Sequence, residues 1–261
     1  MTAQGDLRVG HGPTRVQGLV LIGGLVGAVV VCAVILLRTP EPFLPWVKSG
    51  SAILLLAAAL LAPRRHPAFG WVVAAFGASA AGDLFLTVIH LGGGLSQIAG
   101  MGLFAVAYLL LTVAFWRGRF VAYGLRYLAT YGLVGAALVY GLWPRLEGVM
   151  RIGLPAFVVV IVVMAWSAAT TPTRGVFSRR VGELFAIGAG TLVASDAAVA
   201  FVMFSPPPDA WQVPVDAFVR VTYFVGWLLF LLAILDPEPS ASGLAAVESA
   251  PTTRPVHHRA H

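Results

Sequence analysis

The chain consists mostly of long apolar stretches separated by short segments rich in Arg, Pro or Gly. A helix needs about 20 apolar residues to cross the hydrocarbon core of a bilayer, roughly 30 Å, because each residue adds about 1.5 Å. Stretches of this kind cover approximately residues 17–37, 46–62, 69–90, 97–115, 122–142, 152–170, 181–204 and 214–235. The pattern predicts an all-α, polytopic membrane protein built as a bundle of eight transmembrane helices.

Proline positions agree with these boundaries, because proline inside a helix removes a hydrogen bond and clashes with the preceding turn. All 17 prolines lie in predicted tails, loops or first turns. Pro155 and Pro214 alone fall inside a predicted helix, and both lie near its start, where proline is tolerated. The first apolar stretch is too long for a signal peptide and no small-residue cleavage site follows it, so we expect a retained helix.

Composition excludes a soluble protein and argues against nucleic acid as a partner. Hydrophobic residues make up 59% of the 261 positions and charged residues only 11%, against roughly one quarter charged in soluble domains. The net charge of +6 comes from short Arg clusters that flank apolar stretches, as expected beside a lipid bilayer. The single cysteine, Cys32, allows neither an intramolecular disulfide nor a cysteine-based metal site.

The basic residues predict the orientation in the membrane. Counted to the nearer side, 12 lie on the side of the N-terminus and five on the other. The positive-inside rule therefore predicts a multi-pass protein of the cell membrane with both termini in the cytoplasm. We expect residues 1–16 to form a cytoplasmic tail, 17–235 the transmembrane domain, and 236–261 a disordered cytoplasmic tail. His257, His258 and His261 fit that tail better than a metal site.

Two acidic residues lie deep inside predicted helices, away from the helix ends, where an unpaired carboxylate costs several kcal/mol. Asp83 and Asp196 follow the predicted helix starts by 14 and 15 residues, which places them roughly 21 and 22 Å deep, in the outer half of the membrane. They could serve as caps or helix-to-helix contacts, but two acids at one depth favour a functional site. The segments around them share a weak similarity, with Gly77, Ala81 and Asp83 repeated 113 residues later, which suggests a parallel duplication.

Other polar residues fall near the same predicted level. Arg220 follows the start of the last helix by six residues and Tyr223 shares its helix face; Arg220 could point inward or extend to the headgroups. Tyr108 lies somewhat deeper, and both tyrosines could be interior aromatics with satisfied hydroxyls. Lys48, the only lysine, could likewise reach outward or inward.

Short motifs in a consistent order make the chain resemble the YhhN-like lysoplasmalogenase family over about residues 46–235. The motifs are Val47-Lys48, Gly82-Asp83, Gly102-Leu103-Phe104, Tyr108-Leu109-Leu110, Gly188 through Ser195-Asp196, and Tyr223-Phe224 with Gly226. The chain departs from the family at Ser49, where proline is usual, at Tyr108, where histidine is frequent, and at Trp227, where histidine or glutamine is common.

The resemblance implies hydrolysis of the vinyl ether bond of a lysoplasmalogen, a lysophospholipid held in the bilayer. Such hydrolysis needs proton delivery to the carbon β to oxygen and water attack on an oxocarbenium ion, as in glycoside hydrolysis. We hypothesise that Asp83 and Asp196 form the acid/base pair, that Lys48 and Arg220 bind phosphate, and that Tyr108 and Tyr223 contact the substrate. No metal or other cofactor is required. The alternative is a non-enzymatic membrane protein, a proton-coupled lipid carrier or a scaffold.

Overall fold

The computed structural model confirms the all-α prediction over the residues that it describes, namely 44–62, 68–87, 89, 94–116 and 124–236, together with Gly18, Gly23 and Gly27. These ranges contain no strand and hold seven α-helices. The helices are α2 (Leu44–Leu61), α3 (Phe69–Thr87), α4 (Leu95–Phe115), α5 (Leu125–Leu142), α6 (Met150–Ala169), α7 (Arg179–Phe204) and α8 (Asp209–Leu235), with short 3-10 turns at Trp143–Arg145 and Thr171–Thr173.

The predicted count of eight helices is not confirmed, because the predicted helix 17–37 lies outside the described residues apart from three glycines. The predicted tails 1–16 and 236–261 also lie outside them, except for Asp236. Six of the described helices are long and apolar enough to span a membrane. Within α2, Lys48–Leu61 forms a shorter apolar helix. These observations make the chain an integral membrane protein.

Five described helices, α2, α4, α6, α7 and α8, begin two to five residues earlier than the hydropathy pattern predicts. The polar starts of α7 and α8 have local reasons. Ser178 accepts a hydrogen bond from the Val181 amide at 3.2 Å, so α7 starts at Arg179. Helix α8 starts directly after the proline run, with Asp209 in the first turn, where a negative charge is favourable. Pro155 and Pro214 therefore occupy the sixth positions of α6 and α8, which corrects their predicted place in a first turn.

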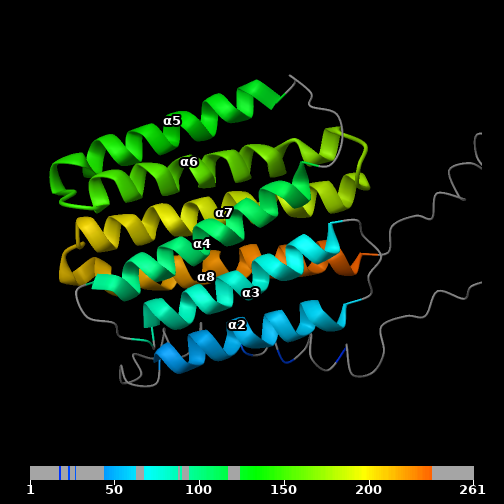
Figure 1. The fold of residues 1–261 in the computed structure, drawn as a ribbon, viewed down its shortest axis with the longest axis horizontal. Helices are drawn as coiled ribbons and strands as arrows, with labels where there is room; N and C mark the ends of the chain where they lie inside the picture. The colour runs from blue at the N-terminus through cyan, green and yellow to red at the C-terminus, as the bar shows by residue number, and fades with distance from the viewer. Residues whose placement is uncertain are drawn as a thin grey trace, which may run out of the picture.

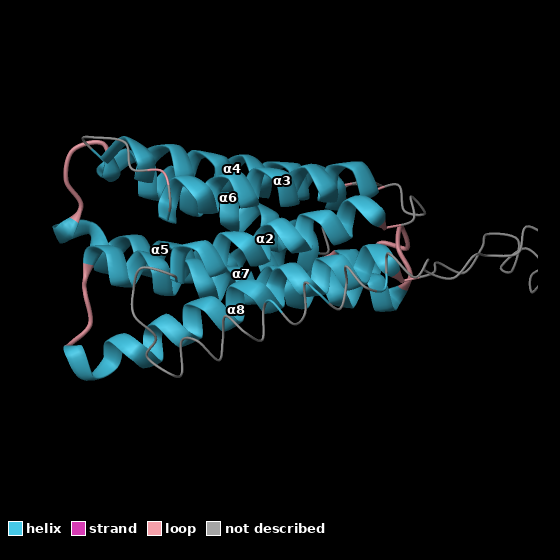
Figure 2. Cartoon of the chain, turned by 90° about the horizontal axis from the view of Figure 1, so that it is seen from below, coloured by secondary structure: helices cyan, strands magenta, loops and turns pink. Residues whose placement is uncertain are grey.

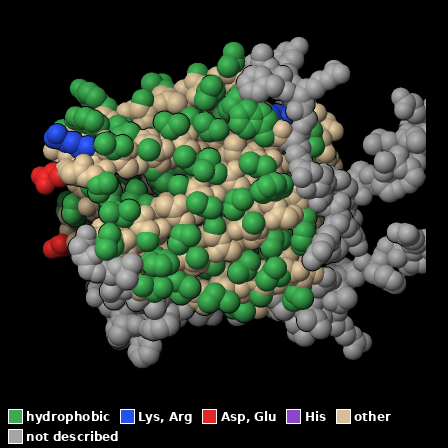
Figure 3. Space-filling view, viewed as in Figure 1, with side chains coloured by type: hydrophobic (Ala, Val, Ile, Leu, Met, Phe, Trp, Pro, Cys, Tyr) green, Lys and Arg blue, Asp and Glu red, His purple; other side chains and the backbone are tan. Residues whose placement is uncertain are grey.

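All described helices are aligned with one long axis, and the connecting loops lie at the two ends of the bundle (Figures 1 and 2). Hydrophobic side chains cover the face seen in Figure 3, and charged side chains appear there only at the ends. This distribution is typical of a protein whose middle is surrounded by lipid.

Two helix pairs, α3 with α4 and α7 with α8, cross at facing glycines. A Cβ on Gly82 would lie 3.2 Å from the carbonyl oxygen of Gly100 and 3.0 Å from the Phe104 ring. In the second pair, a Cβ on Gly188 would lie 3.0 Å from the carbonyl oxygen of Gly226. Small residues permit such close approach of backbones in membranes. The two helical hairpins, α3–α4 and α7–α8, therefore use the same close packing of facing glycines.

Replacing Gly226 by alanine is expected to destabilise the protein by about 1–3 kcal/mol, because the added carbon overpacks the helix crossing. Its Cβ would lie 2.7 Å from Leu192 Cγ and 3.0 Å from a backbone oxygen. The matched control is Gly102→Ala in α4, where a Cβ meets nothing within 4 Å and alanine favours the helix. Thermal unfolding in detergent compares the two variants, and a Gly226→Ala protein as stable as the control would contradict the close crossing.

Helix α5 lies at one edge of the bundle, beside α6 (Figure 1). Only Gly135 and Leu142 of α5 are buried. A Cβ on Gly135 would lie 2.7 Å from Val158 Cγ1 and 3.0 Å from Val162 Cγ2, so this glycine permits the close approach of α5 to α6. Most of α5 therefore faces outward.

Candidate functional site

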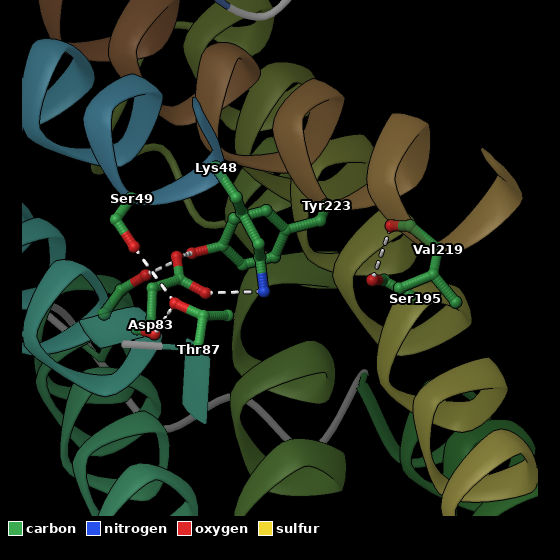
Figure 4. A network of polar contacts seen from close by, with 8 residues as sticks. Lys48, Ser49, Asp83, Thr87, Ser195, Val219 and Tyr223 are labelled. Carbon is green, nitrogen blue, oxygen red and sulfur yellow. Dashed lines mark hydrogen bonds and ion pairs between the residues drawn. The ribbon is translucent and has the colours of Figure 1, made fainter. Parts of the chain in front are cut away.

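Asp83 in α3 is completely buried and holds an ion pair with the only lysine of the chain. Lys48 Nζ of α2 lies 2.7 Å from Asp83 Oδ1, and the hydroxyl of Tyr223 of α8 donates to Asp83 Oδ2 at 2.5 Å (Figure 4). The Lys48 ammonium also lies 5.2 Å from the centre of the Tyr223 ring, a cation–π contact. Lys48 therefore points inward, which answers the question that the sequence left open.

Three further hydroxyl groups support this cluster, of which the sequence analysis named only Ser49, and that as a departure from the family. The Ser79 hydroxyl lies 2.8 Å from the Tyr223 oxygen. Thr87 Oγ1 donates to the Asp83 carbonyl oxygen at 2.6 Å and lies 3.1 Å from the Ser49 hydroxyl (Figure 4). Ser79 and Thr87 precede and follow Asp83 by four residues, so helical spacing could have revealed that all three share one face. Ser49, the departure from the family proline, joins α2 to α3.

Asp196 in α7 forms a second pair with a buried phenol. The hydroxyl of Tyr108 of α4 donates to Asp196 Oδ2 at 2.5 Å. The Phe104 ring lies between the two tyrosines, with its centre 6.4 Å from that of Tyr108 and 6.1 Å from that of Tyr223. Both pairs therefore join the hairpin α3–α4 to the hairpin α7–α8. In each pair the aspartate lies on the first helix of one hairpin, α3 or α7, and the tyrosine lies on the second helix of the other, α8 or α4.

One cavity connects most of the predicted site residues. Its polar lining includes Lys48, Asp196, Arg220 and Tyr223, together with Ser195. The Ser195 hydroxyl donates to the Val219 carbonyl oxygen at 3.0 Å and so joins α7 to α8 (Figure 4). Asp83 and Tyr108 do not line the cavity, but their hydrogen-bond partners, Tyr223 and Asp196, do. The cavity therefore presents one carboxyl group directly and the other through Tyr223 and Lys48.

Arg220 is largely buried at the cavity, with 17% of its side chain exposed. Its guanidinium lies 3.6 Å from the carboxylate of Asp216, one helical turn earlier and half exposed. This spacing of four residues is visible in the sequence, although Asp216 was not predicted as part of the site. A weakly paired guanidinium beside a cavity is a natural group to bind a phosphate.

The structure also places Trp227, a further residue of the sequence analysis. Trp227, which replaces a polar family residue, is buried against Phe76 and Tyr223, with ring centres 4.8 and 6.4 Å away. Its indole nitrogen has no hydrogen-bond partner among the described residues. The tryptophan therefore closes the space behind Tyr223 instead of adding a polar group to the cavity.

The fold and the site together define a polytopic helical membrane protein with two aspartate–tyrosine pairs at one cavity. The sequence model of the YhhN family matches residues 43–234, most of the chain, and the protein belongs to that family. This confirms the resemblance found from the motifs. No curated protein and no solved structure matches the chain.

Proposed function

We propose that the protein is a lysoplasmalogenase-like hydrolase that cleaves a vinyl ether bond within the membrane. The observation that carries this proposal is the different pairing of two carboxyl groups at one cavity, that of Asp83 completely buried and that of Asp196 partly buried. Asp83 has a cation at 2.7 Å, whereas Asp196 lines the cavity with a tyrosine hydroxyl as its hydrogen-bond partner. Membership of the YhhN family supports the same chemistry.

The different pairing supports opposite roles for the two acids, which the sequence alone left unassigned. Lys48 compensates the charge of Asp83, so we assign Asp83 as the ionised carboxylate. Asp196 has no ion-pair partner among the described residues, and a carboxyl group in apolar surroundings is cheaper to keep neutral. We assign Asp196 as the proton donor, with Oδ2 accepting from Tyr108 and the proton on the other oxygen.

In the proposed reaction, Asp196 transfers its proton to the vinyl carbon β to the ether oxygen, and the carbon bound to that oxygen becomes an oxocarbenium ion. Water attacks this carbon and gives a proton to Tyr223, which passes its own hydroxyl proton to Asp83. The hemiacetal then breaks its bond to the glycerol oxygen, which takes up the proton of Asp83 through Tyr223, while the hemiacetal hydroxyl group gives its proton to Asp196. The products are a fatty aldehyde and a glycerophospho-alcohol, and Asp196 regains a proton as Asp83 returns to the carboxylate.

Arg220 is the residue that we assign to the lipid phosphate. Lys48 is engaged with Asp83 at 2.7 Å, so its proposed part in phosphate binding becomes secondary to its part in holding Asp83. The apolar walls of the cavity would accept the hydrocarbon chain. We also propose that both termini lie in the cytoplasm, because Arg126, Arg174, Arg179 and Arg180 lie near one end of the bundle.

Aldehyde release by the purified protein in detergent tests the function directly. We expect release from a 1-alkenyl lysophosphatidylethanolamine and none from the 1-alkyl analogue, which has the same shape but lacks the double bond that accepts the proton. Equal inertness toward both lipids, in protein with a cooperative melting transition, would contradict the hydrolase. Transfer of the intact lipid between vesicles under the same conditions would then support a carrier.

A further inference from the structure

The cavity has an apolar arm, and the proposed reaction does not specify how this arm connects to the bilayer. This apolar arm is lined by Val134 and Leu138 of α5, Val158 and Val162 of α6, and Ala197 and Ala200 of α7. The polar lining residues named above come mainly from α2, α7 and α8. The cavity therefore has a polar end at the carboxyl groups and an apolar end beneath the peripheral helix α5.

The apolar arm is open at its side. Val134 lines the cavity although 48% of it is exposed. Helix α5 is held mainly by α6 and makes far less contact with α7. A side chain can be both exposed and part of the cavity wall only where the wall reaches the surface, here in the span of α5 that faces lipid. The space between α5 and α7 thus leads from the cavity toward the bilayer.

We propose that the hydrocarbon chain of the lipid passes between α5 and α7 when it moves between the bilayer and the apolar arm. This inference rests on the proposed function, which already names a one-chain substrate, and adds the route that the substrate takes. The polar end supplies a guanidinium for a phosphate and the arm supplies apolar walls for an alkyl chain, so one amphiphile satisfies both ends.

Val134→Trp is the variant that tests the route, because it adds bulk at the exposed edge of the arm without entering the packed core. The matched control is Leu133→Trp, one residue earlier on α5, which is 73% exposed and does not line the cavity. The probe is a 1-alkyl lysophosphatidylethanolamine with a diazirine near the chain end, which the hydrolase cannot cleave. Photolabelled peptides are mapped in the full-length protein in detergent.

In the wild type we expect labelling of α5 and α7 peptides. Val134→Trp should weaken labelling and slow aldehyde release by about tenfold or more, because excluding two methylenes from an apolar site already costs about that factor. Leu133→Trp should match the wild type in both. Melting temperatures show whether each variant is folded, and Val134→Phe replaces the first variant if tryptophan unfolds it.

The outcomes separate this inference from the proposed hydrolysis. Labelling of the arm without aldehyde release from the wild type would support the chain site and overturn the hydrolase. Aldehyde release with labels absent from α5 and α7, or with Val134→Trp indistinguishable from Leu133→Trp, would overturn the chain site and leave the hydrolase standing.

Discussion

Asp196→Asn is expected to lower the rate of aldehyde release by about 10²–10⁴-fold, the range that a positioned acid or base contributes. Asparagine has no proton acidic enough to transfer to the vinyl carbon. Its amide oxygen can still accept the hydrogen bond from Tyr108, which spans 2.5 Å to Asp196 Oδ2 in the structure. The variant should therefore remain folded, and its turnover number should fall at saturating lipid.

The control for this prediction is Tyr108→Phe, which removes the hydroxyl partner but leaves the acid. Because Tyr108 does not line the cavity, we expect a smaller loss, about tenfold, through poorer positioning of Asp196. Asp83→Asn tests the other carboxylate and should also lower the rate. Unchanged turnover in Asp196→Asn, measured with a discontinuous aldehyde assay on folded protein, would remove the proton-transfer role from this residue.

Lys48→Met is expected to destabilise the protein by about 3 kcal/mol, because it leaves a buried carboxylate without its cation. Asp83 has no exposed side-chain surface, and Lys48 is 22% exposed. Methionine keeps most of the length and apolar volume of the lysine stem, so the lost charge dominates. The measurement is equilibrium unfolding in mixed micelles, or the melting temperature where unfolding is irreversible.

Two comparisons isolate the buried charge in that measurement. The double variant Lys48→Met with Asp83→Asn should recover much of the lost stability, since neither charge then remains buried. Arg179→Met breaks an exposed pair with Glu183, 2.8 Å apart at a helix start, and should cost at most about 1 kcal/mol. If Lys48→Met proved no more costly than Arg179→Met, the ion pair would not stabilise Asp83 as the structure indicates.

The internal similarity of the sequence has a counterpart in the packing, but in a different register. The facing glycines make Gly82 of α3 equivalent to Gly188 of α7. Asp83 follows its glycine by one residue, whereas Asp196 follows Gly188 by eight, two helical turns further. The sequence similarity therefore places Asp83 opposite Asp196 but does not place Gly82 opposite Gly188, the two glycines at the helix crossings. A parallel duplication remains a prediction.

The sequence by itself determined the helices between residues 44 and 235, the membrane setting, the family, and the presence of two acids inside spans. These are local properties, since apolar length and helix boundaries depend on neighbouring residues along the chain. Helix starts were less certain because caps such as Ser178 involve single polar residues.

Only the tertiary structure decided how the polar groups are paired. Asp83 and Tyr223 are 140 positions apart in the chain, and Asp196 and Tyr108 are 88 apart, so no periodicity links them. Lys48 could have reached either the headgroups or the interior. The contact with Asp83 selects the interior. An ammonium group 2.7 Å from a buried carboxylate interacts with it much more strongly than a solvent-exposed ammonium interacts with its surroundings. The different pairing of the two acids, on which the proposed chemistry depends, exists only once distant helices pack together.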